Sequence, residues 1–136
     1  MAWLNDQIHQ GVPCWPLYVQ LSEMISSDIA WEEMEVLIKT IRLLEDTMVD
    51  RNVNGIELEK KGEIGEAIAL YEANISDRFD GSHPYNRLRI IYESLNDYAN
   101  AIRVCESYIN NGGHDEKLCK LFRLKIAKLK GEESGR

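Results

Sequence analysis

Three cysteines and three histidines are the residues of this sequence best suited to metal chemistry, and they are widely scattered. Cys105, His114 and Cys119 form the tightest set, with eight and four residues between successive members. A structural zinc site needs a fourth ligand and more closely spaced ligand pairs. We therefore expect no bound metal, and we expect Cys105 and Cys119 to be small buried apolar residues.

Other reactive residue types lack the partners that catalysis requires. Cys14, between Pro13 and Trp15, is reactive only where it is exposed, and we expect it to be packed. Asp77 and Asp80 resemble part of a calcium loop, but the terminal glutamate of such a loop is missing. The sequence has no glycine-rich phosphate loop and no nucleophile motif. It therefore predicts a protein that is not an enzyme and has no cofactor.

Composition and charge narrow the class of protein further. The chain has 136 residues, 44% of them hydrophobic, which suits one domain or a short array of repeats. Its 16 basic and 23 acidic residues give a net charge of −7, which argues against direct binding to nucleic acid. No apolar run approaches the ~18 residues of a membrane helix, and the start lacks a secretory signal. We expect a soluble, cytoplasmic protein.

Two stretches of the chain resemble each other when the sequence is aligned with itself so that residue 62 falls on residue 96. Residues 62–68 (GEIGEAI) then align with residues 96–102 (NDYANAI), and Tyr71 aligns with Cys105. Each copy predicts a helical hairpin, with first helices at residues 48–61 and 85–94. The apolar positions of the two first helices are Val49, Val53, Ile56 and Leu58, and Leu88, Ile91, Tyr92 and Leu95.

Turn and packing residues support the hairpins. Gly62 and Asn96 tolerate the left-handed conformation that ends a helix, so each predicts a turn. Small Ala67 and Ala101 let the two helices of a hairpin approach closely. Ahead of the second hairpin, Ser82 is a candidate helix cap, and Pro84 suits a first helical turn.

These residues resemble the tetratricopeptide repeat family, of the small bacterial or phage type, whose repeats have a length of about 34 residues. The resemblance implies an all-α fold in which antiparallel helical hairpins stack into a right-handed solenoid with a C-terminal capping helix. Arg89 stands in the second copy where the family has a glycine. The positions that carry the resemblance are Gly55, Gly62, Ala67 and Tyr71 in one copy, and Leu88, Tyr92, Asp97, Tyr98, Ala101 and Tyr108 in the other.

The repeat divides the chain into five parts. Residues 1–47 form N-terminal helices, either a degenerate repeat or an unrelated hairpin, with Met34, Leu37 and Ile41 on its second helix. Repeats follow at 48–81 and 82–115, and a capping helix at 116–130 packs through Leu118, Phe122, Ile126 and Leu129. Residues 131–136 are expected to be a flexible tail.

In such an array the first helices line a concave side that binds a peptide or a partner segment. The rows that recur at the repeat offset are Ile56, Ile90 and Leu124, and Asn52, Asn86 and Lys120. In some members of the family, lysine, arginine and asparagine hold a peptide's terminal carboxylate, and here Asn86, Arg87 and Lys117 would supply part of that set. The candidate partner-binding residues are Asn52, Ile56, Asn86, Arg87, Ile90, Lys117, Lys120, Leu121, Leu124 and Lys128.

Three functions remain open at this point. The first is a non-enzymatic protein-interaction module whose groove takes a protein or peptide, with an acidic one fitting best. The second is a self-associating structural protein that uses its N-terminal hairpin and its basic cap helix, where residues 117–130 hold six basic residues and no acidic one. The third is a small regulatory or inhibitory protein that masks a larger bacterial or phage-related enzyme. None of the three needs nucleic acid or a membrane.

Overall fold

The structure, a computed structural model, is all-helical over the residues that it describes, 31–111 and 115–134. The helices are α3 (Trp31–Lys60), α4 (Ile64–Ser76), α5 (His83–Ser94), α6 (Tyr98–Asn111) and α7 (Glu116–Ser134). The chain divides into two compact units, residues 1–77 and 78–136. Among the described helices, none combines the length and the apolar character needed to cross a membrane.

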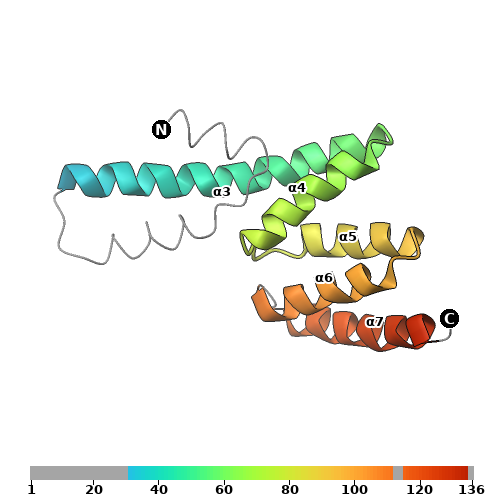
Figure 1. Cartoon of the computed structure of the whole chain (residues 1–136). Helices are drawn as coiled ribbons and strands as arrows, with labels where there is room; N and C mark the ends of the chain where they lie inside the picture. The colour runs from blue at the N-terminus through green and yellow to red at the C-terminus, as the bar shows by residue number, and fades with distance from the viewer. Residues whose placement is uncertain (1–30, 112–114, 135–136) are drawn as a thin grey trace. The chain divides into compact units, whose positions relative to one another are not determined.

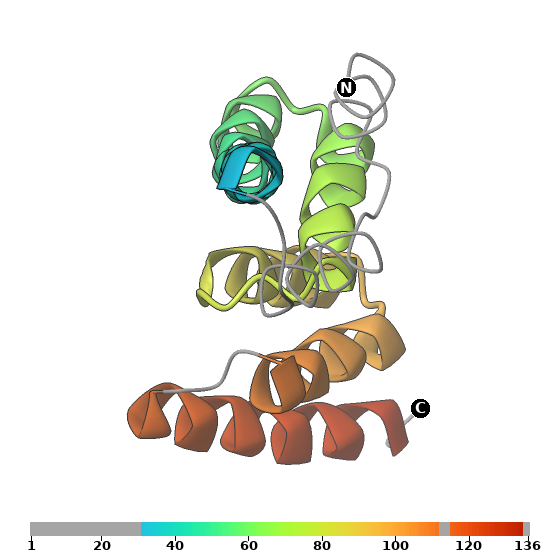
Figure 2. The same cartoon turned by 90° about the vertical axis from the view of Figure 1, so that its left-hand side faces the viewer.

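Each unit is built from helices that are consecutive in the chain. In the first unit α4 folds back along the C-terminal half of α3, and the two helices pack together (Figure 1). In the second unit α6 lies between α5 and α7 and packs against both (Figure 2). The all-α prediction is thus confirmed. The stacking of hairpins into a right-handed solenoid concerns both units at once and stays a prediction.

Helix α3 is longer than the sequence analysis predicts. It continues from Trp31 to Lys60 through residue 47, where we placed the boundary between the N-terminal helices and the first repeat. The two helices expected on either side of that boundary are one helix, because residues 31–54 contain neither glycine nor proline. The part of the expected N-terminal helices within residues 1–30, like Cys14, lies outside the described residues.

The turns of the two hairpins share one hydrogen-bond pattern, displaced by the repeat offset. Gly62 has a φ of 80° and Asn96 a φ of 60°, so both adopt the predicted left-handed conformation. The Glu63 amide donates to the Leu58 carbonyl at 2.9 Å, and the Asp97 amide donates to that of Tyr92 at 2.8 Å. Such a bond closes a helix C-terminus, so the same local device ends α3 and α5.

The close-packing positions of the two hairpins are equivalent but filled differently. Ala67 and Ala101 are both fully buried, as predicted. In the first hairpin, a Cβ atom on Gly55 would lie 2.5 Å from the ring of Tyr71, so the absence of a side chain makes room for the tyrosine. In the second, the equivalent positions hold Arg89 and the smaller Cys105, and both are buried. A small residue on one helix therefore accompanies a large one on the other in both copies.

An aromatic cluster joins the three helices of the second unit. Tyr108 on α6 makes an edge contact with Tyr85 on α5, with ring centroids 5.4 Å apart. Tyr108 also contacts Phe122 of α7, with ring centroids 4.7 Å apart. Tyr85 and Phe122 are at most 1% exposed, so this cluster is the centre of the core. The predicted packing of the cap helix through Phe122 and Leu129 is confirmed.

Several apolar positions do not pack as predicted. Val49 and Val53 are 52% and 53% exposed, and Leu95, at the end of α5, is 58% exposed. Helix α3 instead buries the polar residues Arg51 and Asn52, which find partners on Asp77 and Asn74. The buried hydroxyls of Thr40 and Thr47 donate to carbonyls of α3 itself. Its buried residues are Leu37, Thr40, Leu44, Thr47, Arg51, Asn52 and Gly55.

Two local details at helix ends also differ from the sequence analysis. Ser82 occupies the N-cap position of α5, but its side chain makes no capping hydrogen bond, whereas Pro84 does lie in the first turn. Residues 131–134 are helical instead of forming part of a flexible tail. Gly131 has no neighbour that a side chain would meet, and a single glycine weakens a helix by only about 1 kcal/mol without ending it.

Candidate functional site

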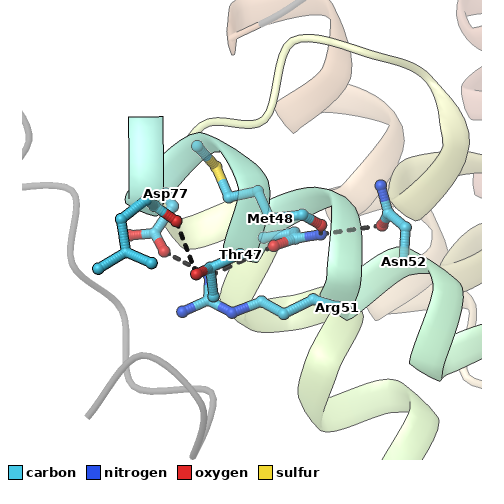
Figure 3. A network of polar contacts seen from close by, with 7 residues as sticks. Thr47, Met48, Arg51, Asn52 and Asp77 are labelled. Atoms are coloured by element: carbon cyan, nitrogen blue, oxygen red, sulfur yellow. Dashed lines mark hydrogen bonds and ion pairs between the residues drawn. The ribbon is translucent and has the colours of Figure 1, made fainter. Parts of the chain in front are cut away.

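A buried polar network, and not a binding groove, surrounds one of the predicted site residues. Asn52 is 9% exposed, and its Oδ1 accepts a hydrogen bond from Asn74 Nδ2 at 2.9 Å. Asn74 Nδ2 also donates to the Met48 carbonyl at 2.7 Å. Arg51 completes the network: its Nη1 lies 2.5 Å from Asp77 Oδ2 and 3.3 Å from Asn74 Oδ1. Figure 3 shows Arg51, Asn52 and Asp77 of this network together with Met48.

This network has a structural role inside the first unit. The side chains of Arg51 and Asp77 are 3% and 2% exposed, so their opposite charges compensate one another away from water. Asn52 belongs to the same network, so its amide bonds Asn74 of α4 within the chain instead of a partner. The repeat predicts Asn52 in the row Asn52, Asn86 and Lys120, but periodicity alone does not distinguish an inward amide from an outward one.

Other predicted site residues are partly covered. Ile56, Asn86 and Arg87 are half-buried, and Ile90 is 36% exposed. The Oδ1 of Asn86 accepts a hydrogen bond from Arg89 Nη2 at 2.9 Å. Because Ile56 belongs to the first unit and the others to the second, the row Ile56, Ile90 and Leu124 stays a prediction.

Helix α7 brings together the remaining predicted residues on one face. Asp115 caps the N-terminus of the helix: its Oδ1 accepts hydrogen bonds from the amides of Lys117 at 2.9 Å and Leu118 at 3.2 Å. The inward side of the helix carries Cys119, Phe122 and Leu129, all buried. The opposite side is exposed and carries Lys117, Lys120, Leu121, Leu124 and Lys128. We call these five residues the α7 face.

The α7 face combines apolar surface with a rim of one charge. Leu124 is 70% exposed and Leu121 is 42% exposed. The three lysines of the face are exposed as well. Counted from Lys117 as position i, the lysines lie at i, i+3 and i+11 and the leucines at i+4 and i+7, so all five share one side of the helix. Since the sequence from 117 to 130 holds no acidic residue, no carboxylate within that stretch neutralises the lysines. The face therefore suits an apolar ligand surface bordered by carboxylates.

A second exposed face, on α3, was not identified from the sequence. It consists of Asp46, Val49, Asp50, Val53 and Glu57, all of which are exposed. We call these residues the α3 face. Their positions repeat the helical spacing of the α7 face. The sequence pattern predicts Val49 and Val53 in the core, because apolar residues at helical spacing usually pack. The alternation of valines with carboxylates along one stripe was the signal that pointed outward.

The buried thiols and tyrosines of the second unit are suited to packing and not to reaction. Burial raises the pKa of the Cys105 thiol to about 12, which keeps it protonated at neutral pH. Burial likewise raises the pKa of Tyr85 to about 12, and its hydroxyl donates a hydrogen bond to the Phe79 carbonyl at 2.5 Å. Within residues 31–111 and 115–134, no three histidine, cysteine or acidic side chains gather closely enough to hold a metal ion. His114 lies outside that part of the chain.

The geometry thus offers a surface on α7 and a second, oppositely charged surface on α3. Comparison of the chain with protein-family models, with curated proteins and with solved structures finds no match.

Proposed function

We propose that the chain is a non-enzymatic protein-interaction module and that the α7 face is its binding surface. The observation that carries this proposal is the exposure of Leu124 and Leu121 inside a border of lysines. Scattered exposed leucines need no explanation, but two that adjoin along one helical stripe form a continuous apolar patch. Removal of such a patch from water is the usual driving force for association.

The partner segment that fits this surface is acidic and amphipathic. Its apolar side chains would cover Leu121 and Leu124, and its carboxylates would meet Lys117, Lys120 and Lys128. Charge complementarity of this kind raises the association rate and selects among partners, while the apolar contact supplies most of the affinity. A helix is the natural form for such a segment, since helical spacing matches the spacing of the α7 face.

The rigid attachment of α7 supports a binding role. Phe122 is 1% exposed and Leu129 is fully buried, so the inward side of the helix is fixed in the core of the second unit. The Tyr108–Phe122 contact ties the helix to α6 at the level of the exposed leucines. A binding surface held in place in this way loses little conformational entropy when a partner docks.

The proposal is tested with a synthetic probe and two matched variants. The probe is a helical peptide with leucines along one stripe and glutamates on either side, and its control carries lysines in place of the glutamates. We expect the acidic probe to bind the full chain and to perturb the amide signals of residues 117–128 in an NMR titration. Leu124→Glu should weaken binding by ~10-fold or more, as loss of a central apolar contact does.

Leu95→Glu is the control variant. Leu95 is 58% exposed at the end of α5, so it is comparably accessible but lies outside the α7 face. We expect Leu95→Glu to bind the acidic probe as the wild type does. Equal loss of binding in both variants, or equal binding of the acidic and basic probes, would contradict the proposal.

A further inference from the structure

The α3 face and the α7 face share one spacing and carry opposite charge. Each residue of the α3 face corresponds to the residue at the same place in the α7 face, and the two are always the same number of positions apart in the sequence. Asp46 corresponds to Lys117 at one end, and Glu57 corresponds to Lys128 at the other. Both stripes therefore occupy positions i, i+3, i+4, i+7 and i+11 of a helix, a length of about 17 Å. Each contains three charged and two apolar side chains: Asp46, Val49, Asp50, Val53 and Glu57 on one, and Lys117, Lys120, Leu121, Leu124 and Lys128 on the other.

We propose that the partner of the α7 face is a second copy of this chain, which docks its α3 face there. The inference rests on the proposed function and names its partner. The α3 face is an acidic amphipathic helical stripe, which is the chemistry that the α7 face fits, and every copy carries one. Val49 and Val53 are 52% and 53% exposed, so apolar surface is open to water on both sides of the contact.

Charge separation along the chain favours this pairing over like-with-like pairing. Two α7 faces would bring three lysines against three lysines, and two α3 faces would oppose carboxylates. Like charges placed face to face are unfavourable, whereas α3 against α7 opposes three carboxylates with three lysines. Glu57 already contacts Lys60 of its own helix at 3.3 Å, but both side chains are exposed, and such a surface pair is weak enough to exchange partners. The contact is therefore heterologous: each copy uses one surface to hold the next copy and the other surface to be held.

The size of the contact sets its strength. Stripes of three helical turns bury less surface than the roughly 1,200 Å² of a standard stable interface. The association is accordingly weak, reversible and dependent on concentration. Because lysine–carboxylate attraction supplies much of its selectivity, the association constant falls as salt is added.

The experiment measures the molar mass of the full chain over a range of protein and salt concentrations by sedimentation equilibrium. We expect a mass above that of the monomer at low salt that declines toward the monomer as salt is raised. Two reversal variants are compared: Asp46→Lys with Glu57→Lys on the α3 face, and Lys117→Glu with Lys128→Glu on the α7 face. Each alone should weaken self-association by ~10-fold or more.

Rescue separates this pairing from a general effect of charge. A chain that carries all four reversals again opposes unlike charges, so it should self-associate as the wild type does. The control is Glu66→Lys with Glu106→Lys, which alters net charge as much as the α3 reversal but changes exposed residues of α4 and α6. This control should associate normally. Far-UV circular dichroism verifies that each variant is folded.

The outcomes distinguish this inference from the proposed function. A wild type that stays monomeric at every concentration refutes the pairing of copies, and binding of the acidic probe through Leu124 would then still support the interaction module. Self-association that survives both reversals, or a charge-swapped chain that stays monomeric, also overturns the pairing. A wild-type chain that does not bind the acidic probe and also stays monomeric would overturn both proposals.

Discussion

The contact between Gly55 and Tyr71 gives a quantitative test of the first hairpin. A Cβ atom at position 55 would lie 2.5 Å from Cε1 and 2.6 Å from Cζ of the tyrosine ring. Ordinary carbon contacts are about 3.5–4.0 Å, so the ring would have to retreat by about 1 Å. Tyr71 is fully buried, and its hydroxyl donates a hydrogen bond to Glu59 Oε2 at 2.6 Å, so little retreat is possible.

Gly55→Ala therefore combines two opposing effects. Overpacking of a buried side chain costs about 1–3 kcal/mol, while alanine is favoured over glycine inside a helix by about 1 kcal/mol. Gly65→Ala on α4 is the matched control, because a Cβ atom there meets nothing within 4 Å. We expect Gly65→Ala to raise the free energy of unfolding by about 0.5–1 kcal/mol and Gly55→Ala to lower it or leave it no higher.

Urea unfolding followed by circular dichroism measures both changes, and amide hydrogen exchange in α3 and α4 reports the first unit by itself. The second hairpin supplies a rescue: Cys105 occupies the position that corresponds to Tyr71. In a Tyr71→Cys background, Gly55→Ala should no longer encounter the ring, which gives a coupling free energy of about 1–3 kcal/mol. If Gly55→Ala stabilises the chain as much as Gly65→Ala does, the proposed packing at this position is refuted.

Two further predictions concern buried ionisable groups. Asp77→Ala leaves the Arg51 guanidinium buried without its counter-charge and should lower the free energy of unfolding by about 3–5 kcal/mol, whereas joint Arg51→Met and Asp77→Leu should cost much less; urea midpoints compare the two. Burial raises the pKa of the Cys105 thiol from 9.0 to about 12, so between those pH values the folded chain keeps a proton that the unfolded chain releases. The free energy of unfolding should then fall by about 1.4 kcal/mol per pH unit across that window, and Cys105→Ala, measured at the same pH values, should show a shallower decline.

The helical hairpins were predictable because their signals are local. Gly62 and Asn96 are residue types that accept a positive φ, and both have one. Ala67 and Ala101 are small, and both lie at fully buried positions. A turn or a close approach depends on the backbone and side-chain volume of a few neighbouring residues, so the amino-acid types suffice to locate it. The inward side of α7 followed for the same reason, since its apolar stripe is unambiguous.

Which side of α3 faces inward was decided only by tertiary structure. The sequence offers two stripes on that helix, one with Val49 and Val53 and one with Arg51 and Asn52, and burial of the apolar stripe is the simpler expectation. The polar stripe is the buried one because Asp77 and Asn74, which are distant from it in the sequence, meet its charge and amide. That compensation is a non-local property, so no helical periodicity reveals it.

The same distinction separates the two candidate surfaces. Sequence alone determined that residues 117–130 form a basic helix with leucines off its packing stripe, and the exposure of Leu124 agrees with that prediction. The acidic counterpart on α3 emerged only when the polar stripe took the inward position and left Val49 and Val53 in water. Charge and helical spacing can be read from the sequence. Which of two faces of a helix remains exposed depends on whether the helix packed against it offers partners to the polar groups of the buried face.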